Sequence, residues 1–211
     1  MQFTETGPGD AETTILLAHG AGAPMDSAAM EAAAQALAAN GLRVIRFEFQ
    51  YMAERRSGGA KRPPPKIRRL LEEYLEAVAA LPPHGRLVVG GKSMGGRVAS
   101  MIADQLHEAK GISGVLCLGY PFHPPQKPSQ TRTAHLQQLQ TPTLIVQGTR
   151  DPFGSREDVE SYSLSSQIEL LWLEDGDHDL KPRKSISGFT ADEHMNTMAK
   201  AVRTWAAGLS G

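Results

Sequence analysis

Residues 86–96 read Arg-Leu-Val-Val-Gly-Gly-Lys-Ser-Met-Gly-Gly, an apolar run followed by a glycine-rich turn around Ser93. The run 86–89 predicts a strand, and the apolar spacing after the turn predicts a helix. Residues 91–95 therefore match G-x-S-x-G in the strand–turn–helix setting that presents a serine as a nucleophile. Glycines two residues before and after the serine let the strand and the helix approach closely.

Two alternatives apply to the same stretch. Gly91-Lys92-Ser93 also resembles the end of a phosphate-binding loop, G-x-x-x-x-G-K-[ST], but the first glycine of that motif would fall on Arg86 in mid-strand. The second alternative is that the glycines only pack a strand-to-helix turn. The rest of the chain has to decide between that alternative and a nucleophile.

Composition bounds the class of protein. A length of 211 residues with 40% hydrophobic content suits one core, so we expect a single domain over residues 1–211. Twenty-two basic and 23 acidic residues give a formal charge of −1, which argues against nucleic-acid and membrane-surface partners. Residues 1–6 do not resemble a secretory signal, and Cys117, the one cysteine, lies in an apolar run. A cytoplasmic protein without disulfides is expected.

Strand and helix signals alternate along the chain, which predicts an α/β protein with a mainly parallel sheet and helices on both faces. The predicted strands are 14–18, 44–47, 86–89, 115–118, 143–146 and 168–173. The predicted helices begin with 27–39, with Asp26 as N-cap, and 66–81. A third helix follows Ser93 and is expected to bury Val98, Met101, Ile102 and Leu106, and a short one begins at Ser155. The last helix follows the capping box Thr190-x-x-Glu193 and is expected to bury Met195, Met198, Val202 and Trp205. Residues 54–69 and 119–130 are expected to be irregular.

A serine nucleophile needs a base, and the base needs a carboxylate that orients it. Asp151 follows strand 143–146 in a glycine-containing turn, and His178 follows strand 168–173. Parallel strands end at one edge of a sheet, so both side chains should reach the rim where Ser93 stands. Their order, serine then acid then histidine, is the one expected for this motif. We therefore predict Ser93, Asp151 and His178 as the catalytic residues.

Neighbouring residues compete for two of these roles. Asp177 adjoins His178, although adjacent loop residues rarely direct their side chains at each other, and His123 is the competing base although it precedes the acid in the chain. Asp175, Asp177 and Asp179 suggest a calcium loop, but Gly176 breaks its spacing. The other histidines are weaker candidates for the base: His19, His84, His107, His135 and His194.

The oxyanion formed by attack on a carbonyl needs two N–H donors. Met94, directly after the serine, should supply one from its backbone. The loop after the first interior strand should supply the other, with Ala21 as the first choice and Gly22 next. Small residues in that loop allow a backbone N–H to approach a substrate closely.

These loops together resemble those of an α/β-hydrolase. More narrowly, residues 19–23, 91–97, 119–124 and 175–178 resemble a compact subfamily that contains bacterial hydrolase-like proteins, testis-expressed protein 30 and the hydrolase-like domain of NSL-complex subunit 3. The similarity covers about residues 12–207 and implies the α/β-hydrolase fold and the same three catalytic residues. It implies no substrate. Dienelactone-hydrolase-like enzymes are near neighbours, but they have a cysteine where Ser93 stands.

The expected function is hydrolysis of a small carboxylic ester or thioester, with no metal or organic cofactor. Loop 119–130 is too short for a multi-helix lid, and Tyr120, Phe122 and Met94 are predicted to wall an open site. Arg55 and Arg56, in the basic loop 54–69, are predicted to contact an anionic substrate or a protein partner. The simpler alternative for that loop is a solvated, positively charged edge.

Two other functions use the same features. A binding module would keep the scaffold and hold a partner at loop 54–69, and an acyltransferase would use the same nucleophile. Serine, aspartate and histidine on three strand ends favour an enzyme, because binding alone has no need of them.

Overall fold

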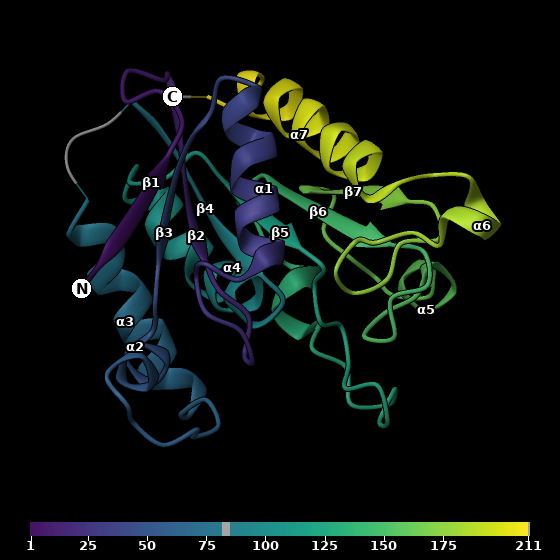
Figure 1. Ribbon diagram of the computed structural model, residues 1–211, viewed down its shortest axis with the longest axis horizontal. Helices are drawn as coiled ribbons and strands as arrows, with labels where there is room; N and C mark the ends of the chain where they lie inside the picture. The colour runs from purple at the N-terminus through teal and green to yellow at the C-terminus, as the bar shows by residue number, and fades with distance from the viewer. Residues whose placement is uncertain (82–84, 211) are drawn as a thin grey trace.

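The computed structural model describes residues 1–81 and 85–210. Across this part of the chain a seven-stranded sheet has the order β1-β3-β2-β4-β5-β6-β7 (Figure 1). The strands are β1 Phe3–Thr6, β2 Thr13–Ala18, β3 Arg43–Phe47, β4 Arg86–Lys92, β5 Gly114–Leu118, β6 Thr143–Gly148 and β7 Ile168–Leu173. β1 pairs antiparallel with β3, and all other neighbours are parallel. The mainly parallel sheet expected from the sequence is therefore present.

Helices cover both faces of the sheet. α1 Ala28–Ala39 and α7 Ala191–Ala207 pack beside each other on one face, and α3 Ile67–Ala79 and α4 Met94–Glu108 pack beside each other on the opposite face (Figure 1). Shorter helices occupy loops: α2 Gln50–Arg56, the 3-10 turn η1 Ala134–Gln137, α5 Arg156–Glu160 and α6 Lys184–Ser187.

The interior strands are buried on both sides, which explains their unbroken apolar runs. In β2, Leu16 and Ala18 pack toward α3 and α4, whereas Ile15 and Leu17 pack toward α1 and α7. All six residues of β2 are buried. Alternating side chains of one strand therefore pack into two separate hydrophobic cores, one on each face of the sheet.

Several local predictions were confirmed and others were wrong. Capping boxes start α5 at Ser155 and α7 at Thr190, as the latter's sequence predicted. Asp26 is not the cap of α1: Ser27 takes that position, and Asp26 pairs with Arg56 instead. Met101 faces outward and is 36% exposed. β1, α2 and α6 are not predicted from the sequence, because they are short elements with weak periodicity, and α2 extends to Arg56, into the stretch 54–69 that was expected to be irregular.

The parallel strands end along one edge of the sheet, and the loops beyond that edge bring residues distant in sequence together. β4 leads to Ser93, β6 to Asp151 and β7 to His178. Within the described residues, no helix is both long and apolar enough to cross a bilayer. The cytoplasmic location stays a prediction from the sequence.

Candidate active site

Ser93 sits in a strained turn between β4 and α4. Its backbone has φ 51° and ψ −114°, a conformation that residues with a side chain rarely adopt. The Ser93 N–H donates to the Leu118 carbonyl (3.0 Å), and the Arg97 N–H donates to the Ser93 carbonyl (3.1 Å). A Cβ added at Gly95 would lie 2.4 Å from the Ala18 carbonyl oxygen, so only glycine lets α4 approach the sheet this closely.

His178 lies between Ser93 and Asp151. Its Nε2 is 2.8 Å from Ser93 Oγ, and its Nδ1 is 2.8 Å from Asp151 Oδ2. The imidazole packs on Phe153, with ring centroids 4.2 Å apart. The His178 side chain is 20% exposed, so the ring is held by the protein and still faces solvent.

Asp151 is fully buried, and each of its oxygens accepts a hydrogen bond. Oδ1 accepts from the Phe153 N–H (2.8 Å), and Oδ2 accepts from Gln147 Nε2 (2.9 Å) beside its contact with His178. Gln147 is buried too, and its Oε1 accepts from the Tyr120 N–H (2.7 Å). A buried carboxylate is stable only with such donors, and here they also orient it toward the imidazole.

Three aspartates of the histidine loop, residues 174–183, have separate structural partners. Asp177 Oδ1 accepts the N–H groups of Asp179 (2.9 Å) and Lys181 (3.0 Å) and so holds a turn. Asp175 pairs with Arg183 and lies 3.3 Å from Arg150. Asp179 lies 3.2 Å from Lys92 Nζ. None of the three is hydrogen-bonded to the His178 ring in the described structure, which leaves Asp151 as the acid beside it.

The other histidines lie away from Ser93 Oγ in the described part of the chain. His19 is buried, and its Nε2 accepts from the Phe49 N–H (3.2 Å). The competing base His123 contacts the Pro124 carbonyl (3.0 Å), and its Nε2 lies 3.5 Å from Asp158. His135 contacts Ser100 Oγ (2.9 Å). His84 falls outside the described residues.

Met94 and Ala21, the residues predicted to donate to the oxyanion, both line a cavity that Ser93 borders. Met94 opens α4, so its N–H has no acceptor within the helix. Neither its N–H nor that of Ala21 donates to another residue that the structure describes. The Tyr51 hydroxyl donates to the Ala21 carbonyl (3.0 Å) and so holds the peptide that joins Ala21 to Gly22 and carries the Gly22 N–H. Burial raises the pKa of Tyr51 to about 12, so the hydroxyl keeps its proton at neutral pH.

Two cavities meet at Ser93. The larger, about 340 Å³, has a mainly apolar wall that includes Met94, Ile67 and Leu70, with Arg97 and Arg132 as its charged groups. The smaller, about 260 Å³, is lined by residues 20–23 together with Lys92, His178 and Asp179. Ser93, Ala21 and Phe153 border both. A substrate carbonyl at Ser93 can therefore extend one group into each cavity.

Two predicted wall residues are not at the site. Tyr120 and Phe122 are fully buried, with ring centroids 4.7 Å apart, and neither lines either cavity at Ser93. The Tyr120 hydroxyl donates to the Arg132 carbonyl (2.9 Å). These rings support the loop from below, whereas Pro121 between them reaches the cavity. Met94 does line it, as predicted.

The basic loop 54–69 also differs from expectation. Arg56 is bound to Asp26 (2.7 Å) and Glu48 (2.6 Å), so its charge is already compensated. The Arg55 guanidinium lies 5.4 Å from the Tyr51 ring centre and donates to the Arg62 carbonyl. Neither arginine lines a cavity at Ser93, whereas two prolines of the loop, Pro64 and Pro65, do.

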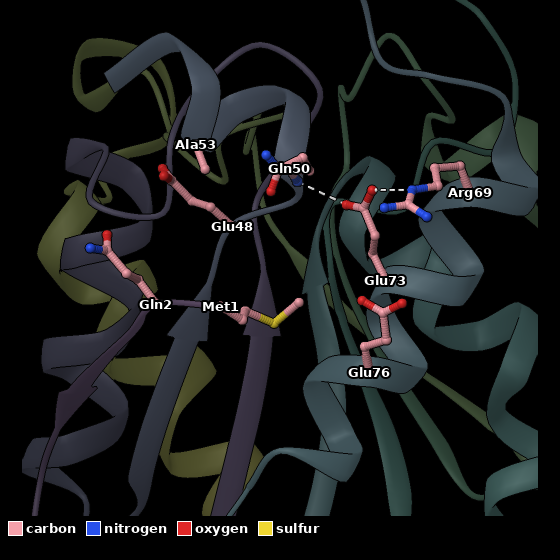
Figure 2. Close-up of a pocket in the computed structure, with 8 residues that line it drawn as sticks. All are labelled: Met1, Gln2, Glu48, Gln50, Ala53, Arg69, Glu73 and Glu76. Carbon is pink, nitrogen blue, oxygen red and sulfur yellow. Dashed lines mark hydrogen bonds and ion pairs between the residues drawn. The ribbon is translucent and has the colours of Figure 1, made fainter. Parts of the chain in front are cut away.

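Another cavity, of about 320 Å³, lies near the start of β1 and holds Glu48, Glu73 and Glu76. Figure 2 shows the Glu73 carboxylate between Arg69 and the backbone of Gln50, with bonds of 2.7 and 2.8 Å. Arg69 is therefore committed to Glu73. This cavity contains no serine, cysteine or histidine among its lining residues, and it is separate from the two at Ser93.

Sequence patterns missed five residues that shape the site. Gln147 and Phe153 hold Asp151, Lys92 holds the histidine loop, and Arg97 and Arg132 enter the larger cavity. Lys92 and Arg97 lie inside or next to the serine motif, but nothing in their spacing indicates a direction for their side chains.

Comparison with protein families matches residues 11–207 to the family described as Alpha/beta hydrolase domain. The chain belongs to the α/β-hydrolase family. The sheet order and the strand-to-helix turn at Ser93 agree with that assignment, and the predicted fold class is confirmed.

Solved structures resemble this α/β-hydrolase at low sequence identity, which supports the fold alone. A lidless α/β serine hydrolase from Xanthomonas campestris has a TM-score of 0.69 and 19% identity, over 96% of this chain and 88% of that one. Est1E from Butyrivibrio proteoclasticus, solved with ferulic acid, has a TM-score of 0.67 and 16% identity, over 98% and 94%. The thioesterase domain from the curacin biosynthetic pathway has a TM-score of 0.62 and 15% identity, over 97% and 94%.

Proposed function

We propose that this α/β-hydrolase is a serine hydrolase that cleaves a small carboxylic ester or thioester. The observation that carries the proposal is the unbroken contact from Ser93 Oγ through His178 to Asp151, with 2.8 Å at each step. A serine in a strained turn, a histidine in contact with it and a buried carboxylate behind the histidine are the parts that nucleophilic acyl transfer needs. The resemblance to the narrower subfamily of testis-expressed protein 30 is part of this proposal.

In the proposed reaction, Ser93 Oγ attacks the substrate carbonyl carbon while its proton passes to His178 Nε2. Asp151 stabilises the resulting imidazolium and holds its orientation. The N–H groups of Met94 and Ala21, with Gly22 as the alternative donor, bind the oxyanion. Cleavage of the C–O or C–S bond returns the proton to the leaving group and leaves an acyl-Ser93 ester. Water then attacks the acyl carbon while His178 takes its proton. The C–O bond to Ser93 breaks, Ser93 regains its proton from His178, and the carboxylic acid is released.

The two cavities suggest where the two parts of a substrate bind. The leaving group must take its proton from His178, which lines the smaller cavity and not the larger. We therefore assign the leaving group to the smaller cavity and the acyl group to the larger, mainly apolar one. Proteins of similar fold include an esterase domain from Rhodothermus marinus and the curacin thioesterase domain, so the fold is compatible with both ester classes.

A fluorophosphonate probe tests the nucleophile. We expect the purified protein to become labelled on Ser93 at neutral pH, as read by mass spectrometry of the modified peptide. Ser93→Ala should lose labelling and lower ester hydrolysis by ~10³-fold or more, since the catalytic residues act as a unit. Thermal unfolding should show that the variant remains folded.

Ser100→Ala provides the matched control. Ser100 lies on the same helix α4 and contacts a histidine, His135, at 2.9 Å, but it is buried and neither of its bonds reaches a carboxylate among the described residues. Labelling and hydrolysis should survive this change. Labelling that persists in Ser93→Ala would refute the assignment. A wild-type protein that is neither labelled nor active on any ester or thioester would favour a binding module.

A further inference from the structure

The larger cavity at Ser93 holds two arginines in an otherwise mainly apolar wall. Arg97 belongs to the first turn of α4, four residues after Ser93, and Arg132 belongs to the long loop after β5. Pro64, Pro65 and Met94 are among the residues that complete the wall. Two arginines therefore line the same small cavity as the nucleophile.

Neither arginine forms an ion pair within the described residues. Arg97 Nε is buried and has no hydrogen-bond partner there, and Arg132 makes one long side-chain bond, from Nη1 to the Pro121 carbonyl (3.4 Å). By contrast, Arg56 and Arg69 are matched with carboxylates. A partly buried guanidinium without a partner is unfavourable, so an anion from outside the chain would be stabilised here.

The positive charge of Arg97 affects two neighbouring titratable groups, Arg132 and His135. Burial and the charge of Arg97 lower the pKa of Arg132, and they lower the pKa of His135 to about 4. The negative charge of Asp104 opposes this decrease in the pKa of His135. Asp104 Oδ1, however, already accepts from the Thr141 N–H (2.9 Å) and hydroxyl (2.7 Å). No carboxylate of the described chain therefore balances the pair.

We propose that Arg97 and Arg132 bind a carboxylate at the far end of the acyl group, so that the preferred substrate is a half-ester or half-thioester of a short dicarboxylic acid. This inference rests on the proposed function, which assigns the acyl group to the larger cavity. The planar guanidinium matches a carboxylate through paired N–H donors, and the apolar wall suits the methylene chain between the two ends.

Two esters with the same leaving group test the inference. One is the mono-p-nitrophenyl ester of adipic acid, which carries a free carboxylate, and the other is its neutral methyl ester analogue. We expect wild-type kcat/KM to favour the acid by roughly 10- to 100-fold, the range for hydrogen bonds to charged groups. Arg97→Gln and Arg132→Gln should each reduce that preference, because each should lower kcat/KM on the acid far more than on the neutral ester.

Arg203→Gln is the matched control, because this substitution also removes one positive charge. Arg203 is exposed on α7, which lies on the opposite face of the sheet from α4. It should leave the preference unchanged. Arg97→Lys keeps the charge without the fork and should retain part of the preference, which separates anion binding from a general packing defect. Replacing Lys61 and Arg62 with glutamine tests the basic loop as the rival anion site.

Different results would overturn the carboxylate site and the hydrolase activity. A labelled, active enzyme with equal kcat/KM on both esters, or a preference lost only in the Lys61 and Arg62 variant, overturns the carboxylate site and leaves the hydrolase intact. If no ester is cleaved, adipate and dimethyl adipate are titrated by calorimetry. Adipate binding that is weakened in Arg97→Gln and absent for the diester supports the site, and no adipate binding overturns it.

Discussion

Ser93 and Asp151 show how single residues are prepared for chemistry. The positive φ of Ser93 is maintained because both its N–H and its carbonyl are hydrogen-bonded to neighbouring elements. Asp151 is kept in place without solvent contact because Gln147 and the Phe153 backbone donate to its two oxygens. Both arrangements are costly in isolation and persist only because the surrounding fold holds them.

Replacing Asp151 tests its role directly. Asp151→Asn should lower kcat by ~10³- to 10⁴-fold, because the amide no longer fixes the tautomer and orientation of His178. Asp177→Asn should have a much smaller effect, since Asp177 bonds backbone N–H groups of its own turn and not the imidazole. Steady-state kinetics on one ester, with circular dichroism to verify folding, distinguishes them. A crippled Asp177→Asn beside an active Asp151→Asn would transfer the role to Asp177.

The histidine loop contains no helix or strand, yet hydrogen bonds and ion pairs connect many of its residues. Asp175 and Leu180 take left-handed conformations, with φ of 55° and 62°, on either side of His178. The Arg183 side chain holds the pKa of Asp175 at about 2, so this pair stays charged across the working pH range. Lys92 Nζ donates to the His178 carbonyl (2.6 Å) and ties the loop to β4.

Lys92→Met should loosen this loop while keeping the volume of the side chain. Burial already lowers the pKa of Lys92, so an uncharged replacement is expected to be tolerated by the fold. We expect kcat to fall roughly 10- to 100-fold because small misplacements of a catalytic group are costly. KM should change much less.

Asp179→Asn is the comparison for that prediction. It removes the ion pair with Lys92, at 3.2 Å, but leaves the bond to the His178 carbonyl. Its effect on kcat should stay below about threefold, because the Asp179 carboxylate is half exposed and the bond that holds the His178 carbonyl remains. Equal kcat losses in both variants would show that the ion pair, and not the tether to His178, positions the loop.

On the scale of the whole molecule, one edge of the sheet carries the chemistry and two cores carry the stability. α3 and α4 cover one core, and α1 and α7 cover the other. His135 lies on the α4 side, where it contacts Ser100 and is close enough to Arg97 for that charge to act on it. The same uncompensated arginine therefore couples the active-site region to global stability.

This coupling predicts a pH dependence of unfolding. His135 has a folded pKa of about 4, below the 6.5 of an unperturbed histidine, so the unfolded chain binds more protons between these values. The contribution of neutral His135 to stability is therefore present above pH 6.5 and lost as pH falls toward 4. In urea unfolding from pH 7 to 4.5, His135→Gln should give a shallower decline than wild type. Identical slopes would contradict the prediction.

The strand–helix alternation could be read from local sequence patterns, and so could the positions of Ser93, Asp151 and His178 after three strands that end at the same edge. Local patterns are sufficient there, because strands buried on both faces must be apolar and because parallel strands must end together. The G-x-S-x-G spacing likewise follows from close packing around Gly91 and Gly95, where a side chain would strike the Ala18 carbonyl at 2.4 Å.

The directions of the long side chains depend on tertiary contacts and could not be predicted from the sequence. Tyr120 and Phe122 turn into the core, and Arg56 turns to Asp26 and Glu48, although the sequence placed all three beside the substrate. Arg97 and Arg132, which have no signal in the sequence, enter the cavity instead. An aromatic or arginine side chain takes the direction in which distant segments offer burial or an opposite charge, and local spacing contains no information about those segments.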